Sequence, residues 1–316
     1  MLKNKVFLFI IGLLTSALLL EGGVRIASPL LGPPLVSWNT MEDAKRLKLD
    51  EFRKKHGKPN YVFMGNSTTL IGVDTIIVDK YLQDKLLKSF NAGMNGANIV
   101  NMRDFAINYI IPEVKPKNLV LLFSNTSMLL NSTYKNTAVE KNSLLKNSQL
   151  YNYRNTFRDP MTINTLIRVA RFRDSKQGII YRWAAQLNDF GFQDVTRFSV
   201  SDKGWDPNIL RGEANRKIVI DKDQLRYLIE IRNSAESRGI KLIIGTVPTL
   251  SLDQKLRETT REVASMLNID FIQGNDAVSS GKYFQDGTHL NYPGRVELSE
   301  FLGNEIKRIR LSEDIN

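Results

Sequence analysis

The apolar positions of this chain fall into short uninterrupted runs that alternate with longer stretches of helical spacing. Five short runs are expected as strands: Tyr61–Met64, Ser89–Ala92, Leu119–Phe123, Ile240–Gly245 and Ile269–Ile272. The run Leu119–Phe123 has no polar position, which is typical of a strand buried on both faces of a sheet.

Four stretches between and after these runs have the spacing of amphipathic helices. They are Ala97–Ile111, Asp221–Arg238, Leu252–Leu267 and Pro293–Ile309. Pro112 is expected to end the first, Gly239 follows the second, and Pro293 opens the last. Strands that alternate with helices predict an α/β fold: a three-layer, doubly wound parallel sheet with helices on both faces.

The N-terminus has a different pattern. Lys3 and Lys5 precede an uncharged apolar run, Val6 to Leu20, which is just short of the roughly 20 residues of a membrane-spanning helix. Residues 1–27 are therefore expected to be an N-terminal transmembrane anchor or a signal. An anchor is favoured because no small-x-small cleavage site is obvious before Arg25. The basic start would stay in the cytoplasm, so the remainder is expected on the extracytoplasmic side, in the periplasm or at the cell surface.

Three further segments follow this anchor. Residues 28–58 are expected to be a linker or stalk, because 28–40 is rich in proline and turn formers and 41–58 is highly charged. Residues 59–316 are expected to form the catalytic domain. Within it, residues 130–217 interrupt the α/β rhythm and are interpreted as an inserted subdomain. Its aromatic residues, with 15 basic and 8 acidic side chains, suit sugar or lipid contacts, or the ordinary packing of a lid.

The amino-acid composition excludes several kinds of catalytic and metal site. The 316 residues contain no cysteine, which excludes disulfides, thiolate metal sites and a cysteine nucleophile. The only histidines are His56 and His289, so any imidazole base is one of these two. The net charge of +11 favours anionic partners, but no nucleic-acid-binding motif is present, so no nucleic-acid partner is expected.

Ligands of parallel α/β sheets bind beyond the carboxyl ends of the strands. Four segments follow expected strands or precede the last helix and carry unusual polar residues: Gly65–Thr68, Asn91–Gly96, Ser124–Ser127 and Asp286–Asn291. Ser67, on a tight strand-to-helix turn, would present its hydroxyl outward. Asp286 lies three residues before His289, a spacing that lets the carboxylate hold Nδ1–H while Nε2 faces a nucleophile.

In this order, the four segments resemble the blocks of the SGNH/GDSL hydrolase superfamily. The resemblance runs from about Tyr61 to Ile309 without the insertion, and its most specific part is Asp-Gly-Thr-His-Leu-Asn. It implies an SGNH/flavodoxin-like fold. It also implies that Ser67 is the nucleophile, His289 the base and Asp286 the residue that orients it. Gly96 and Asn125 would be the oxyanion donors, and no metal or organic cofactor is implied.

The chain departs from this family pattern in two places. The usual Gly-Asp-Ser is Gly65-Asn66-Ser67, and the usual Gly-x-Asn-Asp is Phe123-Ser124-Asn125-Thr126. The anchor and the expected export resemble a membrane-anchored branch that transfers acyl groups to envelope polymers, as in alginate acetylation and teichoic-acid D-alanylation. This implies an O-acyltransferase or esterase acting on cell-envelope polysaccharide, with a multi-spanning membrane protein as a candidate acyl donor.

Two other functions stay open at this point. One is a lipid or small-ester hydrolase at the membrane surface, because water and sugar hydroxyls can accept an acyl group from the same three residues. The other is a catalytically silent scaffold that binds glycan or a partner protein.

Overall fold

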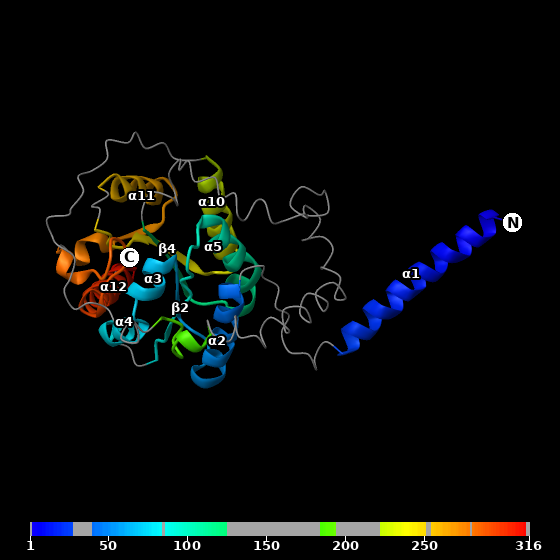
Figure 1. Cartoon of the computed structure of the whole chain (residues 1–316). Helices are drawn as coiled ribbons and strands as arrows, with labels where there is room; N and C mark the ends of the chain where they lie inside the picture. The colour runs from blue at the N-terminus through cyan, green and yellow to red at the C-terminus, as the bar shows by residue number, and fades with distance from the viewer. Residues whose placement is uncertain are drawn as a thin grey trace. The chain divides into compact units, whose positions relative to one another are not determined.

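The structure, a computed structural model, describes residues 2–27, 40–83, 86–124, 184–193, 222–250, 254–278 and 280–313 (Figure 1). The chain divides into two compact units. The first contains Met1–Asp43 and Tyr134–Arg182, and the second contains Ala44–Thr133 and Trp183–Asn316. The second unit carries the sheet and all of the described residues discussed below, apart from the N-terminal helix and the first residues of α2.

The predicted strands form one sheet of five parallel strands. They are β1 (Tyr61–Met64), β2 (Ser89–Asn91), β3 (Asn118–Phe123), β4 (Lys241–Thr246) and β5 (Asp270–Gln273). Their order across the sheet is β2-β1-β3-β4-β5, the doubly wound order of flavodoxin-like folds. The predicted parallel α/β sheet is therefore confirmed.

Strand β1 is the point at which the winding changes direction. Tyr61 of β1 aligns with Ser89 of β2 on one side and with Asn118 of β3 on the other. The chain thus moves outward from β1 to β2 and then returns across β1 to build the rest of the sheet. In such sheets the carboxyl ends of the two strands at the reversal, here β1 and β3, border a crevice for ligands.

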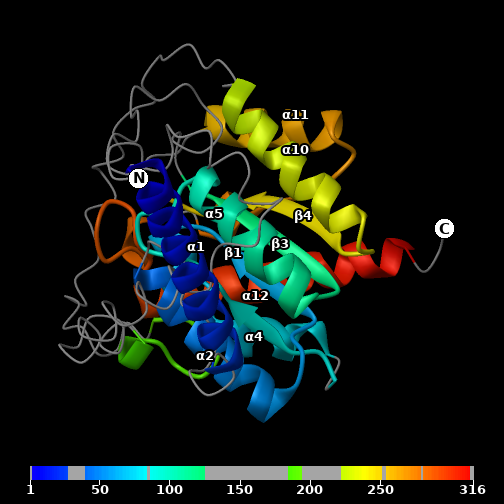
Figure 2. The same ribbon diagram turned by 90° about the vertical axis from the view of Figure 1, so that its right-hand side faces the viewer.

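The helices and short helical turns are distributed around this sheet. They are α1 (Leu2–Ala27), α2 (Thr40–His56), α3 (Ser67–Gly72), α4 (Thr75–Leu82), α5 (Ile99–Phe105), η2 (Ala106–Val114), α10 (Lys222–Glu236), α11 (Gln254–Met266), η5 (Gly274–Ala277), η6 (Gly281–Tyr283) and α12 (Tyr292–Glu313). Helices α4 and α12 pack together, as do α5 and α10, and Figure 2 shows these pairs on opposite faces of the sheet. The layers are those expected from the sequence.

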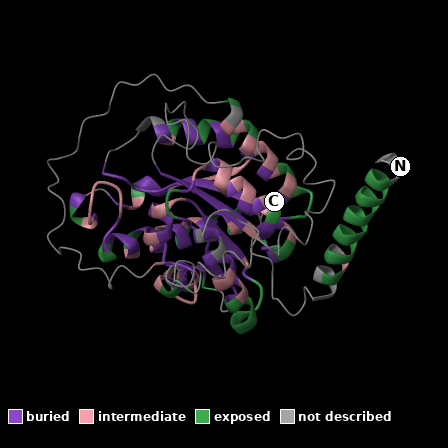
Figure 3. Cartoon of the chain, turned by 45° about the vertical axis from the view of Figure 1, so that its right-hand side comes forward, coloured by how far each residue is buried: buried purple, intermediate pink, exposed green. Residues whose placement is uncertain are grey.

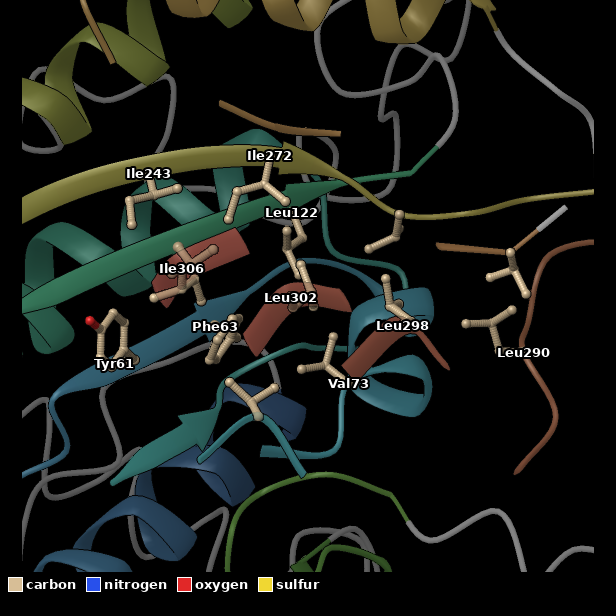
Figure 4. Packing of buried hydrophobic residues seen from close by; sticks show 14 of the residues in the cluster. Tyr61, Phe63, Val73, Leu122, Ile243, Ile272, Leu290, Leu298, Leu302 and Ile306 are labelled. Carbon is tan, nitrogen blue, oxygen red and sulfur yellow. The ribbon is translucent and has the colours of Figure 1, made fainter. Parts of the chain in front are cut away.

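The core under α12 follows from the spacing of its leucines. Leu298, Leu302 and Ile306 recur every four residues, so they share one face of the helix and are fully buried. Figure 4 shows them against strand side chains that include Phe63 and Leu122. Burying each such side chain stabilises the fold by roughly 1.5–3 kcal/mol. Strands β1 to β4 are accordingly buried along most of their length, whereas β5 is buried mainly at Ile272 (Figure 3).

The charged segment expected to belong to a linker or stalk is a helix, α2, that packs against the domain. In α2, Leu49 and Phe52 are fully buried, and the Phe52 ring meets Phe90 of β2 edge-on at 5.5 Å. Lys45 is also buried, and its Nζ donates to the Asn91 carbonyl at 2.8 Å. Burial lowers the pKa of Lys45 well below its usual value. The prediction was wrong because the long stems of charged side chains can cover apolar surface as well as face water.

The helix expected to end at Pro112 continues beyond it. Helix α5 ends at Phe105, and wider π-helical turns then run to Val114, with Pro112 inside. The Lys115 N–H bonds the Ile110 carbonyl, five residues back. The wider turn accommodates a proline that has no N–H to donate, so the expected boundary was wrong.

The apolar N-terminal segment is helical as α1, and its described side chains from Val6 to Leu20 are largely exposed. Within the part of the chain that the structure describes, however, no helix combines the length and apolarity needed to cross a membrane. The expected transmembrane helix therefore has no support from these residues.

Of the expected insertion at 130–217, only residues 184–193 are described, and the remainder lies outside the described residues. We call residues 184–193 the strap. The Asn91 N–H of β2 donates to the Phe190 carbonyl at 2.9 Å, so the strap covers the outer side of this edge strand. Gly191 fits there because a Cβ would lie 2.4 Å from the Asn91 carbonyl oxygen.

Candidate active site

Ser67 lies at the carboxyl end of β1, as the first residue of α3. Gly65 makes the turn between them possible: a Cβ there would lie 2.0 Å from Thr69 Oγ1 and 2.7 Å from the Leu122 carbonyl oxygen. The Gly65 carbonyl also accepts from the Met94 N–H at 3.0 Å, which ties this turn to the loop after β2. The backbone that carries Ser67 is therefore held on two sides.

Asn66 occupies the N-cap of α3 and explains one departure from the family pattern. Its Oδ1 accepts from the Thr68 N–H at 3.0 Å and from Thr68 Oγ1 at 2.6 Å. Its Nδ2 donates to Ser124 Oγ, which follows β3, at 2.5 Å. An aspartate could serve as the cap but could not donate this last bond. The amide thus joins the ends of β1 and β3, the two strands at the reversal of the winding.

His289, near the C-terminal end of the sequence, contacts Ser67. Its Nε2 lies 2.8 Å from Ser67 Oγ, although the two residues are 222 positions apart. The structure therefore brings together the hydroxyl and the imidazole that the sequence singled out. At this distance Nε2 can accept the hydroxyl proton.

Asp286 holds the opposite side of the imidazole. Its Oδ2 lies 2.8 Å from His289 Nδ1, and its Oδ1 accepts from the backbone N–H of Thr288 and of His289, each at 2.8 Å. Partial burial alone would raise the pKa of Asp286, but these hydrogen bonds outweigh it and the pKa lies below its usual value. The ionised carboxylate favours the tautomer with the proton on Nδ1, which leaves Nε2 free to accept.

The loop that carries Asp286 and His289 is fixed by backbone pairing. The Gln285 N–H donates to the His289 carbonyl, and the Asn291 N–H donates to the Tyr283 carbonyl, both at 2.9 Å. Asn291 Nδ2 also donates to the Lys282 carbonyl at 2.7 Å. The loop is thus closed on itself immediately before α12, and the imidazole is presented from a rigid element.

The loop after β2 supports α3 directly. Asn91 Nδ2 donates to the Thr69 and Val73 carbonyls, both at 2.8 Å, and its Oδ1 accepts from the Gly93 N–H. Gly96, further along this loop, is exposed and has a φ of +67°, in the left-handed region that favours glycine. Its place in an oxyanion hole stays a prediction. Asn125, the other predicted donor, lies outside the described residues.

Two elements that the sequence analysis missed connect the two halves of this site. Arg295 of α12 is only 2 % exposed, and its Nη1 donates to the Gln193 carbonyl of the strap at 3.1 Å. The Gln193 N–H donates to the Leu70 carbonyl of α3 at 3.1 Å. The strap therefore joins the helix that begins with Ser67 to the helix that follows His289. The available signal was the spacing of Arg295 from Leu298, which places an arginine on the apolar face of α12.

Together these contacts connect a hydroxyl, an imidazole and a carboxylate in the order that can activate a serine hydroxyl. Among the residues that the structure describes, no three His, Asp or Glu side chains are grouped as metal ligands. The chemistry that the arrangement itself can perform is acyl transfer through a serine ester.

No protein-family model matches the chain, and no curated protein matches it. Solved structures that resemble it include a GDSL-like lipase from Bacteroides thetaiotaomicron, at 12% identity over 85% of this chain and 99% of that one, with a TM-score of 0.41. The psychrotrophic esterase EstA from Pseudoalteromonas matches at 9% identity over 79% and 98%, with a TM-score of 0.42. A member of the lipolytic G-D-S-L family from Veillonella parvula matches at 13% identity over 79% and 96%, with a TM-score of 0.36. Similarities at this level carry no argument about activity, which depends on the residues of this chain.

Proposed function

We propose that this protein is a serine enzyme of acyl transfer, with Ser67 as nucleophile, His289 as general base and Asp286 as the residue that orients it. The observation that carries the proposal is the contact of 2.8 Å between Ser67 Oγ and His289 Nε2, with Asp286 behind the same imidazole. Segments so distant in sequence meet only if the fold brings them together.

The reaction proceeds in two halves. Ser67 Oγ attacks the acyl carbonyl carbon while its proton passes to His289 Nε2. The tetrahedral intermediate collapses, the bond to the leaving oxygen breaks, and His289 returns the proton to that oxygen. An acyl-Ser67 ester remains. Water or a sugar hydroxyl then attacks this ester by the same route, and Ser67 regains its proton. Asp286 stays ionised and stabilises the imidazolium formed in each half.

The developing oxyanion needs donors beside Ser67. The proposed donors are the backbone N–H groups of Ser67 and Gly96, together with the Asn125 side chain. Each donor of this kind lowers the barrier by roughly 3–4 kcal/mol. Replacement of Asn125 by alanine would test its share as a loss of turnover at unchanged affinity.

We further propose the finer assignment that the sequence resemblance implies: an SGNH-type O-acyltransferase or esterase that acts on cell-envelope polysaccharide. It is supported by the ordered motifs around Ser67 and His289 and by the basic charge, which suits acidic glycans. A multi-spanning acyl-donor protein is part of this proposal.

Export and membrane attachment through the N-terminal segment also remain a proposal. They are supported by Lys3 and Lys5 before the apolar run and by the exposed apolar side chains of α1. Because the chain has no cysteine, a single Ser237→Cys variant can be probed with a membrane-impermeant maleimide in intact cells. Labelling is expected if the domain is exported, and protection until lysis would refute export. The mass of the purified protein distinguishes a retained anchor from a cleaved signal.

The nucleophile is tested with a fluorophosphonate probe and a short-chain chromogenic ester. We expect the wild-type protein to be labelled and to hydrolyse the ester, and Ser67→Ala to lose both. The matched control is Ser237→Ala, at an exposed serine whose Oγ donates to the Ser234 carbonyl and accepts from Arg238 Nη1. A folded wild-type protein that resists labelling and leaves the ester intact would contradict the proposal and favour a silent scaffold.

The acceptor is tested separately. The ester content of envelope polysaccharide is compared in cells that carry wild-type protein or Ser67→Ala, and purified protein is offered an acyl donor with a glycan or with phospholipid vesicles. Glycan acylation that depends on Ser67 supports the transferase. Release of fatty acid from the vesicles, with unchanged polymer, would replace it by the lipid hydrolase.

A further inference from the structure

The edge of the sheet opposite Ser67 carries a row of lysines. Because the five strands are parallel, they all begin at this amino edge. Lys88 directly precedes β2, Lys117 directly precedes β3, and Lys241 is the first residue of β4. Backbone hydrogen bonds make the row continuous: the Asn60 N–H donates to the Lys88 carbonyl at 2.7 Å, and the Lys241 N–H donates to the Lys117 carbonyl at 3.0 Å.

Further cations extend this row. Lys58, before β1, is exposed, and so are Lys115 and Lys117 before β3. Three described acids lie near these lysines: Asp270 pairs with Lys241 at 2.5 Å, Asp79 accepts from Ser89 next to Lys88, and Glu113 lies two residues before Lys115. They are fewer than the five lysines at positions 58, 88, 115, 117 and 241. The edge is thus a basic surface rather than a set of mutual ion pairs.

Large apolar side chains project at the same edge. Leu86, two residues before Lys88, is 87 % exposed, and Leu311 near the end of α12 is 53 % exposed. The two belong to one corner of the molecule because Lys307 of α12 donates to Gln83 Oε1, at the end of α4. Leucines exposed beside basic residues supply apolar area that the boundary of an anionic bilayer can take up.

We propose that this amino edge, defined by Lys58, Lys88, Lys115, Lys117 and Leu86, docks on an anionic phospholipid surface. Lysines attract the acidic headgroups, and exposed leucines gain free energy by entering the boundary between headgroups and acyl chains. A soluble polyanion would be attracted by the lysines but would not bury the leucines. The combination therefore favours a bilayer over a nucleic acid or a charged polysaccharide.

The proposal goes beyond the acyl-transfer function and orients it. With the amino edge on the bilayer, the carboxyl edge that carries Ser67 and His289 faces the aqueous side. Substrate would then arrive from solution rather than from within the lipid layer. Membrane docking at the amino edge and catalysis at the carboxyl edge can fail independently, so they are tested by different measurements.

Binding is measured with the full chain and two kinds of vesicle, phosphatidylcholine alone and phosphatidylcholine mixed with phosphatidylglycerol. The apolar helix α1 contributes to both, so the ratio of the two partition coefficients isolates the anionic preference. Each lysine near an anionic surface changes partitioning about fivefold, so a triple Lys58→Gln, Lys115→Gln, Lys117→Gln variant is expected to lower this ratio by on the order of 100-fold. Raising the salt concentration should reduce the wild-type ratio more than that of the variant.

A matched variant removes the same charge elsewhere. Lys222→Gln, Arg226→Gln and Arg261→Gln change exposed cations of α10 and α11, and Arg261 contacts Gln273 at the carboxyl end of β5. This variant is expected to keep the wild-type ratio. An equal fall of the ratio in both variants would show that binding depends on net charge alone, which would overturn the proposal. An unchanged ratio in the amino-edge variant would also overturn it. Loss of binding to a soluble acidic polysaccharide without loss of vesicle binding would assign the edge to glycan instead.

Orientation is tested with single cysteines, for which this cysteine-free chain is suited. An environment-sensitive fluorophore on Leu86→Cys should shift to the blue when anionic vesicles are added. The same dye on Lys282→Cys, an exposed position beside the loop of His289, should not shift. Equal shifts at both positions, or a shift only at Lys282→Cys, would overturn the orientation. Ester hydrolysis by the amino-edge variant is expected to be unchanged, which separates this result from the acyl-transfer proposal.

Discussion

Two aspartates at opposite edges of the same sheet differ in the direction of their pKa shifts. Asp286, at the carboxyl edge, has a pKa below its usual value, whereas burial raises the pKa of Asp79, at the amino edge, to about 6. Both accept backbone and side-chain hydrogen bonds. Asp286 receives two backbone N–H groups, the Thr288 hydroxyl and an imidazole. Among the described residues, Asp79 receives the N–H and the hydroxyl of Ser89.

The difference shows which effect dominates at each edge. Asp286 is exposed over 47 % of its side chain, so few donors are enough to keep it ionised. Asp79, a residue of α4, turns its carboxylate toward the start of β2, and its two donors do not compensate for the lost water. A carboxylate that must stay charged is thus placed where water and backbone donors both reach it.

The largest expected effect follows removal of the charge at Asp286. Asp286→Asn keeps the size of the side chain, but its amide NH₂ can turn toward Nδ1 and stabilise the wrong imidazole tautomer. We expect kcat/KM for a short-chain ester to fall by roughly 10³- to 10⁴-fold, with little change in stability. The pair of measurements is steady-state hydrolysis and thermal unfolding. A loss of less than tenfold would show that Asp286 does not orient the base.

The next effect concerns Arg295, which joins the carboxyl edge to the strap. Arg295→Met removes a buried donor and leaves the Gln193 carbonyl without it, so we expect a loss of about 2 kcal/mol in the free energy of unfolding. Turnover should fall as well, because the strap contacts α3 through Gln193. Arg295→Lys retains one donor and should recover part of both. If kcat is unchanged in Arg295→Met at a temperature where it is folded, the strap does not position the nucleophile.

The raised pKa of Asp79 predicts that the stability of the protein depends on pH. Its folded pKa of about 6 lies above the unfolded value of about 3.9, so the folded state binds the proton more tightly. The stabilisation is complete below about pH 4 and is lost as the pH rises through 6, by on the order of 2 kcal/mol. Asp79→Asn should flatten denaturant midpoints measured across this window. An unchanged slope in the variant would show that burial at the amino edge is less complete than its contacts indicate.

The smallest effect is expected for the cap of α3. Asn66→Ala removes the acceptor for Thr68 and the donor to Ser124, which should cost about 1 kcal/mol of stability and lower turnover severalfold. Asn66→Asp keeps the cap but not the donor, so it separates the two contributions. Chemical denaturation and ester hydrolysis of the two variants provide the comparison. Equal behaviour of both would mean that the bond to Ser124 contributes nothing.

Much of the fold, and the contact between Ser67 and His289, could be predicted because each rests on a local signal in the sequence. The strands show as short apolar runs, and His289 stands out as one of two histidines three residues after an acid. The packed state of α2 could not be predicted, because Lys45 and Phe52 are buried by β2 and the strap, which are distant in sequence. The bond from Asn66 to Ser124 was missed for the same reason, since neither residue alone indicates that β1 and β3 are neighbours.

The contact between Ser67 and His289 also has a consequence for synthesis of the protein. Ser67 is translated early and His289 near the end, so no partial chain on the ribosome can contain both residues. Under the proposed function, an incomplete chain therefore cannot attack esters. Any proteolytic cut that releases α12 should likewise remove activity, because the loop bearing the base is anchored at the start of that helix.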